Sequence, residues 1–176
     1  MQSNEVTEKL QTKAVPMESL AEIIALQLQN GGKAKLTVTG VSMRPLFHHR
    51  RDSVTLVPAN GLQKPGAVIL YRRESGQYVL HRIIACEAAA YICCGDNQAE
   101  RETVLPEQVL AVMDGFTRNG KAYTLDAFGY RVYTAAWVHL FPLRPFYIKI
   151  RRRLGNLRSK ARKHNKRLGG HKNEQK

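Results

Sequence analysis

The sequence predicts a mainly β fold: a compact antiparallel β domain with an N-terminal helix and a basic C-terminal extension. Short segments in which apolar and polar residues alternate recur from Lys33 to Leu125, and a period of two is typical of half-buried strands. Turn-forming residues such as Lys64-Pro65-Gly66 separate these segments. No helical pattern recurs between them, which argues against a parallel βαβ sheet.

The elements follow in order along the chain. Residues 16–29 are expected to form a helix that starts at Pro16, with apolar residues at helical spacing, and that ends at Asn30-Gly31-Gly32. The alternating run KAKLTVTGV (33–41) follows and breaks at Gly40. Further strands are expected at SVTLV (53–57), AVILY (67–71), YVLHRII (78–84), YICC (91–94), VLAVM (109–113) and KAYTL (121–125).

The charge divides the chain into a nearly neutral body and a basic tail. Residues 144–176 contain thirteen Lys/Arg and one acid, Glu174, whereas residues 1–143 contain fifteen basic and thirteen acidic residues. We expect a flexible lead-in (1–15), a folded domain (16–126), an aromatic and basic segment (127–150) and a disordered polybasic tail (151–176). Such a tail predicts an anionic partner, either a lipid surface or nucleic acid.

The segment 127–150 is too polar for a transmembrane helix, which needs about 20 apolar residues. Its aromatic residues mixed with arginines are typical of a segment that lies in the headgroup region. The opening MQSNEVTEKLQTK lacks the apolar stretch of a secretory signal. Cys86, Cys93 and Cys94 fit neither a disulfide framework nor a common zinc spacing, which predicts free thiols.

The stretch GVSMRP carries the first indication of chemistry. Gly40 permits a tight bend, Pro45 prevents a return to regular structure, and Ser42 lies between them. Free backbone N–H groups in such a bend, here those of Ser42 and Met43, can form an oxyanion hole. Taken alone, however, a serine in a Gly/Pro turn is more often structural.

Four short motifs in order resemble the type I signal peptidase superfamily, which includes the self-cleaving LexA-like repressors of the SOS response. They are Gly40-x-Ser42-Met43-x-Pro45, Lys64-Pro65-Gly66, His81-Arg82-Ile83-Ile84 and Gly95-Asp96-Asn97. The match in order and spacing covers residues 33–113. The resemblance implies that residues 16–126 form a catalytic domain of the signal-peptidase/LexA type.

The resemblance also implies the roles of the site residues. Leu80-His81-Arg82 is similar to the branch with a Ser–His pair, found in endoplasmic-reticulum, archaeal and some spore-forming bacterial members. It makes Ser42 the nucleophile and His81 the general base, with no metal or cofactor. An imidazole with a pKa of about 6.5 can accept a proton at neutral pH. The rate should therefore rise with pH through a limb near that pKa, and a flat rate from pH 5 to 9 would argue against the role.

The third catalytic residue stays open. Asp96 is expected to orient His81 or to support the site, and an Asx turn explains the same residue equally well. Glu100 and Glu102 are possible substitutes. The chain departs from the family at Arg51-Asp52, where Gly-Asp is common, and at Gly66-Ala67. These departures predict altered loops. His48 and His49 are expected to be solvated.

These observations together predict a serine-type endopeptidase that cleaves a signal, leader or pro-peptide through an acyl-enzyme. The resemblance implies that the substrate is an extended peptide paired with an edge strand. We expect a cytoplasmic protein bound peripherally to an anionic membrane through its tail, and an integral membrane protein is less favoured. The alternatives are a nucleic-acid-binding protein, supported only by the tail charge, and a catalytically inactive scaffold.

Overall fold

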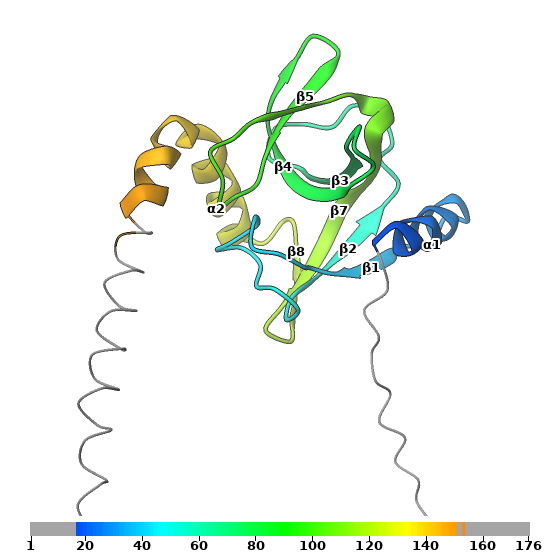
Figure 1. The fold of residues 1–176 in the computed structure, drawn as a ribbon. Coiled ribbons are helices and arrows are strands. Elements are labelled where there is room, and N and C mark those ends of the chain that lie inside the picture. The colour runs from blue at the N-terminus through cyan, green and yellow to red at the C-terminus, as the bar shows by residue number, and fades with distance from the viewer. Residues whose placement is uncertain (1–16, 151–152, 154–176) are drawn as a thin grey trace, which may run out of the picture.

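The computed structural model describes residues 17–150 and 153, so the predicted lead-in and all of the predicted tail except Arg153 lie outside the described residues. Helix α1 (Met17–Gln29) opens the chain and β strands follow it (Figure 1). The strands are β1 (Ala34–Thr37), β2 (Ser53–Val57), β3 (Val68–Arg72), β4 (Tyr78–Glu87), β5 (Ala90–Cys94), β6 (Glu102–Val104), β7 (Val109–Arg118) and β8 (Lys121–Thr124).

The strands form one antiparallel sheet in the order β1-β2-β7-β3-β4-β5-β6, and β8 pairs with β7. A mainly antiparallel β fold with helices toward both ends of the chain is therefore confirmed. Strand β2 has the bounds that the alternation of SVTLV predicts, and most other strands agree within a few residues. Strand β6 was not predicted, because only three residues pair there and two of them are polar.

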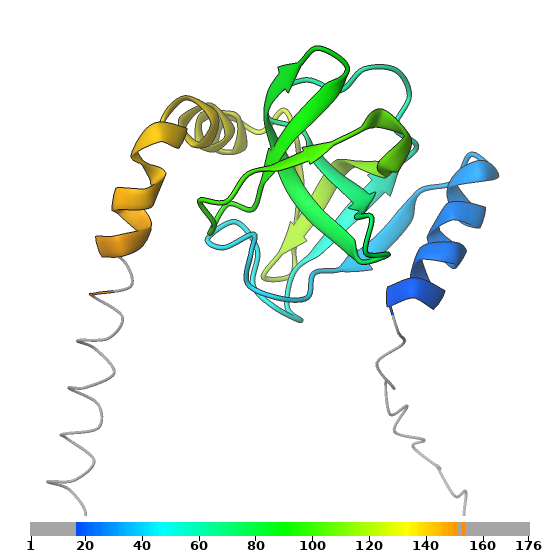
Figure 2. The ribbon, with the colours of Figure 1, turned by 45° about the horizontal axis from the view of Figure 1, so that its top comes forward.

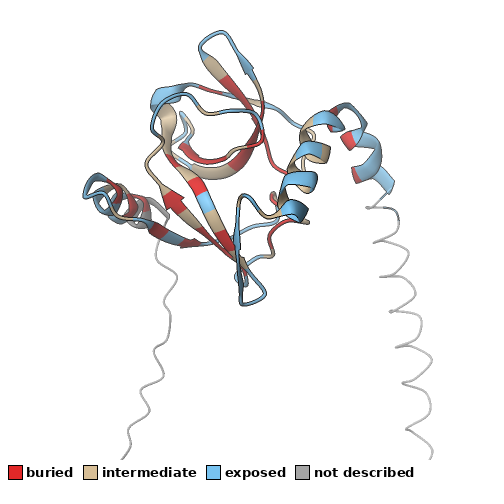
Figure 3. Cartoon of the chain, turned by 180° about the vertical axis from the view of Figure 1, so that it is seen from behind, coloured by how far each residue is buried: buried red, intermediate tan, exposed pale blue. Residues whose placement is uncertain are grey.

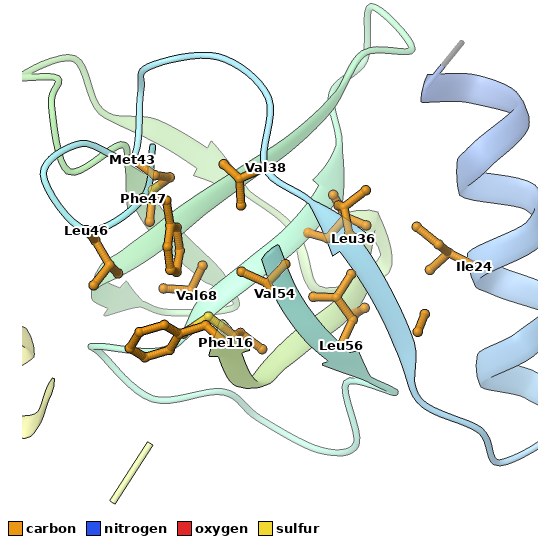
Figure 4. Packing of buried hydrophobic residues seen from close by; sticks show 14 of the residues in the cluster. Ile24, Leu36, Val38, Met43, Leu46, Phe47, Val54, Leu56, Val68 and Phe116 are labelled. Atoms are coloured by element: carbon orange, nitrogen blue, oxygen red, sulfur yellow. The ribbon is translucent and has the colours of Figure 1, made fainter. Parts of the chain in front are cut away.

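The main core lies inside the curved sheet. Ile24 of α1 packs toward Leu36 and Leu56, which explains the apolar spacing of this helix (Figure 4). Other members come from β3, β7 and the loop after β1. A second cluster occupies the other face of β3, β4 and β5, and contains Ile69, Tyr71, Ile83, Tyr91, Cys93 and Val104.

Helix α2 (Phe128–His139) lies on the side of the β body away from α1, as the two views in Figures 1 and 2 show. It is followed by the short helix η2 (Phe141–Leu143), and residues 144–150 are helical too. Another short helix, η1 (Pro106–Gln108), precedes β7. The segment 127–150, expected to lie apart from the domain, thus begins with a helix that contacts the β body.

Candidate active site

Ser42 lies on the turn that follows β1. The next residues of this turn anchor it, because Met43, Leu46 and Phe47 are buried in the main core (Figure 4). Gly40 has a φ of 84°, in the left-handed region that glycine adopts without steric cost. Ser42 thus follows the bend at Gly40 and precedes the buried residues of the turn. It lies at the rim of the core and is partly exposed.

Two polar contacts hold the base of this turn. The backbone N–H of Gly40 donates to Nδ1 of His49 over 2.8 Å, and the N–H of His48 donates to the buried carboxylate of Asp52 over 2.8 Å. Burial alone would raise the pKa of Asp52, but hydrogen bonds from Arg51 and from backbone N–H groups bring it well below its usual range. Asp52 and His49 thus stabilise the turn by accepting hydrogen bonds from its backbone.

His81 reaches the same place from β4. It pairs with Ile69 of β3, and only 1% of its surface is exposed. A Cβ atom added to Gly95 would lie 2.9 Å from the carbonyl oxygen of Ser42 and 3.1 Å from Nε2 of His81. Gly95 therefore lies close to both Nε2 of His81 and the backbone of Ser42.

Ser42 and His81 both line one groove of about 500 Å³. One wall consists of residues 36–43, including the end of β1, and Gln77 with residues 78–81 of β4 contributes much of the other wall. Within the described chain β1 pairs only with β2, so no other strand covers its second edge. Among the described residues the Ser42 hydroxyl forms no hydrogen bond to His81, which is common before substrate binds.

The other ring nitrogen of His81 faces three polar side chains. Its Nδ1 lies 3.1 Å from the hydroxyl of Tyr71 and 3.5 Å from Oε1 of Glu102. The hydroxyl of Tyr71 donates to Oε2 of Glu102 over 2.8 Å, and Arg73 holds the same carboxylate through two of its nitrogens. The acid beside the histidine is therefore Glu102, one of the two substitutes considered from the sequence, and Tyr71 and Arg73 were missed.

These contacts determine which nitrogen of His81 carries the proton. The hydrogen bond from Arg73 lowers the pKa of Glu102, which is thus a carboxylate and cannot donate. Burial raises the pKa of Tyr71, so its hydroxyl stays protonated. This O–H donates its one hydrogen bond to Glu102. The tyrosine oxygen must then accept from Nδ1–H of His81. The neutral imidazole consequently presents an unprotonated Nε2 toward the nucleophile turn.

Burial also fixes the charge of His81 at neutral pH. It lowers the pKa of His81 from its ordinary value to about 4, although the Glu102 carboxylate opposes the shift. A neutral base is what proton abstraction requires. If His81 is the base, this lowered pKa moves the expected acid limb of the rate from the ordinary imidazole range toward pH 4, so a flat rate above pH 5 would not argue against the role.

Asp96 lies on the other face of β4. Arg82, fully buried, donates to both of its carboxylate oxygens over 2.9 Å, and the hydroxyl of Tyr133 donates to Oδ2 over 2.9 Å. Despite burial, the attraction of Asp96 raises the pKa of Arg82 and keeps it charged. In the described structure Asp96 forms no hydrogen bond to His81, so direct orientation of the base by Asp96 gives way to a supporting ion pair.

Helix α2 and the residues after it hold the loop that carries Gly95 and Asp96. The indole N–H of Trp137 donates to the carbonyl of Asp96 over 2.9 Å, and Arg144 donates to the carbonyl of Gly95 over 3.1 Å. Arg144 itself is buried between Trp137 and Phe141. The segment after residue 127 is therefore part of the scaffold of the site.

The backbone groups of Ser42 and Met43 differ in their hydrogen bonding. The carbonyl of Ser42 accepts from the N–H of Asn97 over 2.7 Å, which ties the nucleophile turn to the loop after β5. Within the described residues the N–H groups of Ser42 and Met43 donate to no other group. The use of these two N–H groups as an oxyanion hole stays a prediction from the sequence.

Comparisons with known proteins add nothing to this description: no family model matches the chain, and neither curated proteins nor solved structures gave a significant match.

The three cysteines have free thiols, with Cys93 and Cys94 buried and Cys86 exposed. Across residues 17–150 and 153, every helix is too short or too polar to cross a membrane.

Proposed function

We propose that the chain is a serine-type endopeptidase of the signal peptidase I kind, with Ser42 as nucleophile and His81 as general base. One observation carries the proposal. Ser42, partly exposed, and the buried His81 line the same groove, and the contact of Nδ1 of His81 with the Tyr71 hydroxyl leaves Nε2 as the nitrogen that can accept a proton. The order of the sequence motifs supports the same pair of residues independently.

The reaction that this geometry supports has two steps. Nε2 of His81 takes the hydroxyl proton while Oγ of Ser42 bonds to the peptide carbonyl carbon, and the N–H groups of Ser42 and Met43 stabilise the oxyanion. The C–N bond then breaks and Nε2 returns the proton to the leaving amine. Water hydrolyses the acyl-serine ester by the same proton route, which restores the free hydroxyl.

Glu102 and Tyr71 contribute by position. When His81 is protonated during each step, the Glu102 carboxylate 3.5 Å from Nδ1 stabilises the imidazolium. Tyr71 keeps the neutral ring in the productive tautomer between the steps. The Tyr71 hydroxyl thus links the Glu102 carboxylate to His81.

The substrate proposed is an extended signal, leader or pro-peptide that pairs with the free edge of β1. The test is hydrolysis of a peptide library by the full chain, with Ser42→Ala as the inactive variant. The expected result is cleavage by the parent only and a mass shift at Ser42 when the acyl-enzyme is trapped. Cleavage that persists in Ser42→Ala would refute the proposal, and no cleavage by the parent would favour a scaffold.

A matched pair of tyrosine variants tests the positioning role. Tyr71→Phe removes the hydroxyl that accepts from His81 and donates to Glu102. Loss of the bond to His81, about 0.5–1.5 kcal/mol, should lower kcat about two- to tenfold while KM stays unchanged. Tyr91→Phe is the control, because the hydroxyl of Tyr91 accepts from the N–H of Gln63, away from the site. Equal losses of kcat in both variants would show that Tyr71 acts only through stability.

A further inference from the structure

A second and larger groove lies outside the candidate site, between the outer side of α2 and the loop that joins β2 to β3. Its volume is about 990 Å³, and Asn60 and residues 62–67 line it opposite Phe128, Arg131 and Val132 of α2. None of its lining residues contacts Ser42 or His81 through a hydrogen bond described above, so the peptidase mechanism makes no use of it.

The rim of this groove exposes large apolar side chains. Leu62 is 84% exposed and Phe128 is 82% exposed, and Val132 is half exposed beside them. The outward side of α2 is accordingly exposed in Figure 3, whereas its inward side contacts the loop of the candidate site. Large apolar residues gathered at one groove mark an interaction surface.

The charged side chains that line the groove are basic. They are Lys64 and Arg131, and among the described residues no Asp or Glu lines it, although the exposed Asp126 stands in the sequence between the lining residues Leu125 and Phe128. From residue 127 to 150 the sequence contains no acidic residue, and its exposed cations are Arg131 and Lys149, because Arg144 is buried. Phe146 (68% exposed) and Ile150 (43% exposed) add exposed apolar side chains to the same part of the chain.

We propose that this groove and its apolar rim form a docking surface for the anionic lipids of a bilayer. Apolar side chains enter the acyl boundary while neighbouring cations remain at the headgroups. Nucleic acid would use the cations but would leave Leu62 and Phe128 unburied. Because the other side of α2 binds the Gly95–Asp96 loop, this surface would hold the candidate site at a fixed position relative to the membrane.

The test is sedimentation of the full chain with vesicles of phosphatidylglycerol and phosphatidylcholine. The double variant Leu62→Ser/Phe128→Ser should lower the vesicle partition coefficient about tenfold or more, because two large side chains no longer enter the bilayer. Its control is Ile23→Ser/Leu26→Ser on α1, whose two side chains are 58% and 62% exposed on the other side of the body. This control should bind as the parent does.

A second pair of double variants tests the contribution of the basic side chains to vesicle binding. Lys64→Ala/Arg131→Ala should weaken binding to phosphatidylglycerol vesicles, and more so at low salt, whereas Lys35→Ala/Lys121→Ala should have a smaller effect. Circular dichroism verifies that each variant folds.

Four outcomes would overturn the proposed surface. The first is that the full chain does not bind the vesicles, and the second is that Leu62→Ser/Phe128→Ser binds them as the parent does. The third is that the α1 control loses as much vesicle binding as this double variant. The fourth is that the chain dimerises through these residues without binding lipid. Parent-like binding by the double variant would mean that the basic tail alone attracts the vesicles. None of these readouts measures peptide cleavage, so the proposal stands or falls independently of the proposed peptidase activity.

Discussion

The cleavage rate should stay constant down to about pH 5, because the proposed base is buried. Protonation of His81 removes the lone pair that accepts the serine proton, so the acid limb of kcat/KM follows the pKa of this residue in the free enzyme. Burial lowers that pKa to about 4. The perturbation is therefore a change of pH alone, and the expected response is a plateau that extends well below the ordinary range of imidazole.

The size of the effect separates a buried from an exposed base. At pH 5.5, a histidine with a pKa of about 4 is about 97% neutral, whereas one with the ordinary pKa of about 6.5 is about 9% neutral. The rate at pH 5.5 relative to pH 8 should consequently be about tenfold higher than an exposed histidine allows. This difference is far outside the error of an initial-rate measurement.

The assay is the initial rate of cleavage at low substrate concentration, measured from pH 3.5 to 9 as kcat/KM. Circular dichroism in the same buffers gives the folded fraction, by which each rate is divided. A limb near pH 6.5 in fully folded protein would refute the buried base. The same conclusion would follow if the limb near pH 4 persisted in the residual activity of His81→Gln.

The same burial has a consequence for stability. His81 is neutral in the folded state at pH values where the unfolded chain binds a proton, so this contribution is complete above about pH 6.5 and is lost as the pH falls toward 4. The full shift corresponds to about 3 kcal/mol, of which about 2 kcal/mol is lost by pH 5. Urea unfolding at pH 7 and 5 measures it, and His81→Gln should lack this part of the pH dependence.

Two further predictions concern the loop after β5. Gly95→Ala should lower kcat/KM at least about tenfold, because its Cβ would lie 2.9 Å from the nucleophile's carbonyl oxygen; Gly129→Ala, with open space around its Cβ, is the control and should keep the parent rate. Asp96→Ala should lower the free energy of unfolding by about 3–5 kcal/mol, because it leaves the buried Arg82 unpaired. In contrast, Asp114→Ala breaks an exposed ion pair and should cost at most about 1 kcal/mol in urea unfolding; similar losses in both would contradict this reasoning.

Sequence patterns predicted the elements whose two sides differ most. The alternation of SVTLV, with Val54 and Leu56 buried, gave the bounds of β2. Strand β6 has three residues, too few for any periodicity. The segment around Trp137 was interpreted as a surface segment because its apolar and basic residues are mixed. In the structure α2 divides them, so that Trp137 and Tyr133 face the site loop and Phe128 faces outward.

The candidates for a third site residue show which contacts motif order leaves out. His81 and Arg82 are adjacent in the sequence, but adjacent residues of a strand point to opposite faces of the sheet. Asp96 follows them in the motif, and it lies on the face of Arg82, whose buried guanidinium needs a carboxylate. Motif order therefore suggested the right loop and the wrong neighbour for His81.

Cross-strand register identifies the partners of His81 that motif order misses. Ile69 lies opposite His81, so Tyr71, two residues further along β3, lies on the same face as a diagonal neighbour. Glu102 pairs with Cys93, which pairs with Ile83, and these residues share that face as well. The hairpin pairing of YVLHRII with AVILY would have indicated Tyr71 from sequence alone. Glu102 could not be placed in this way, because its register depends on the short strand β6, which has no periodic signal of its own.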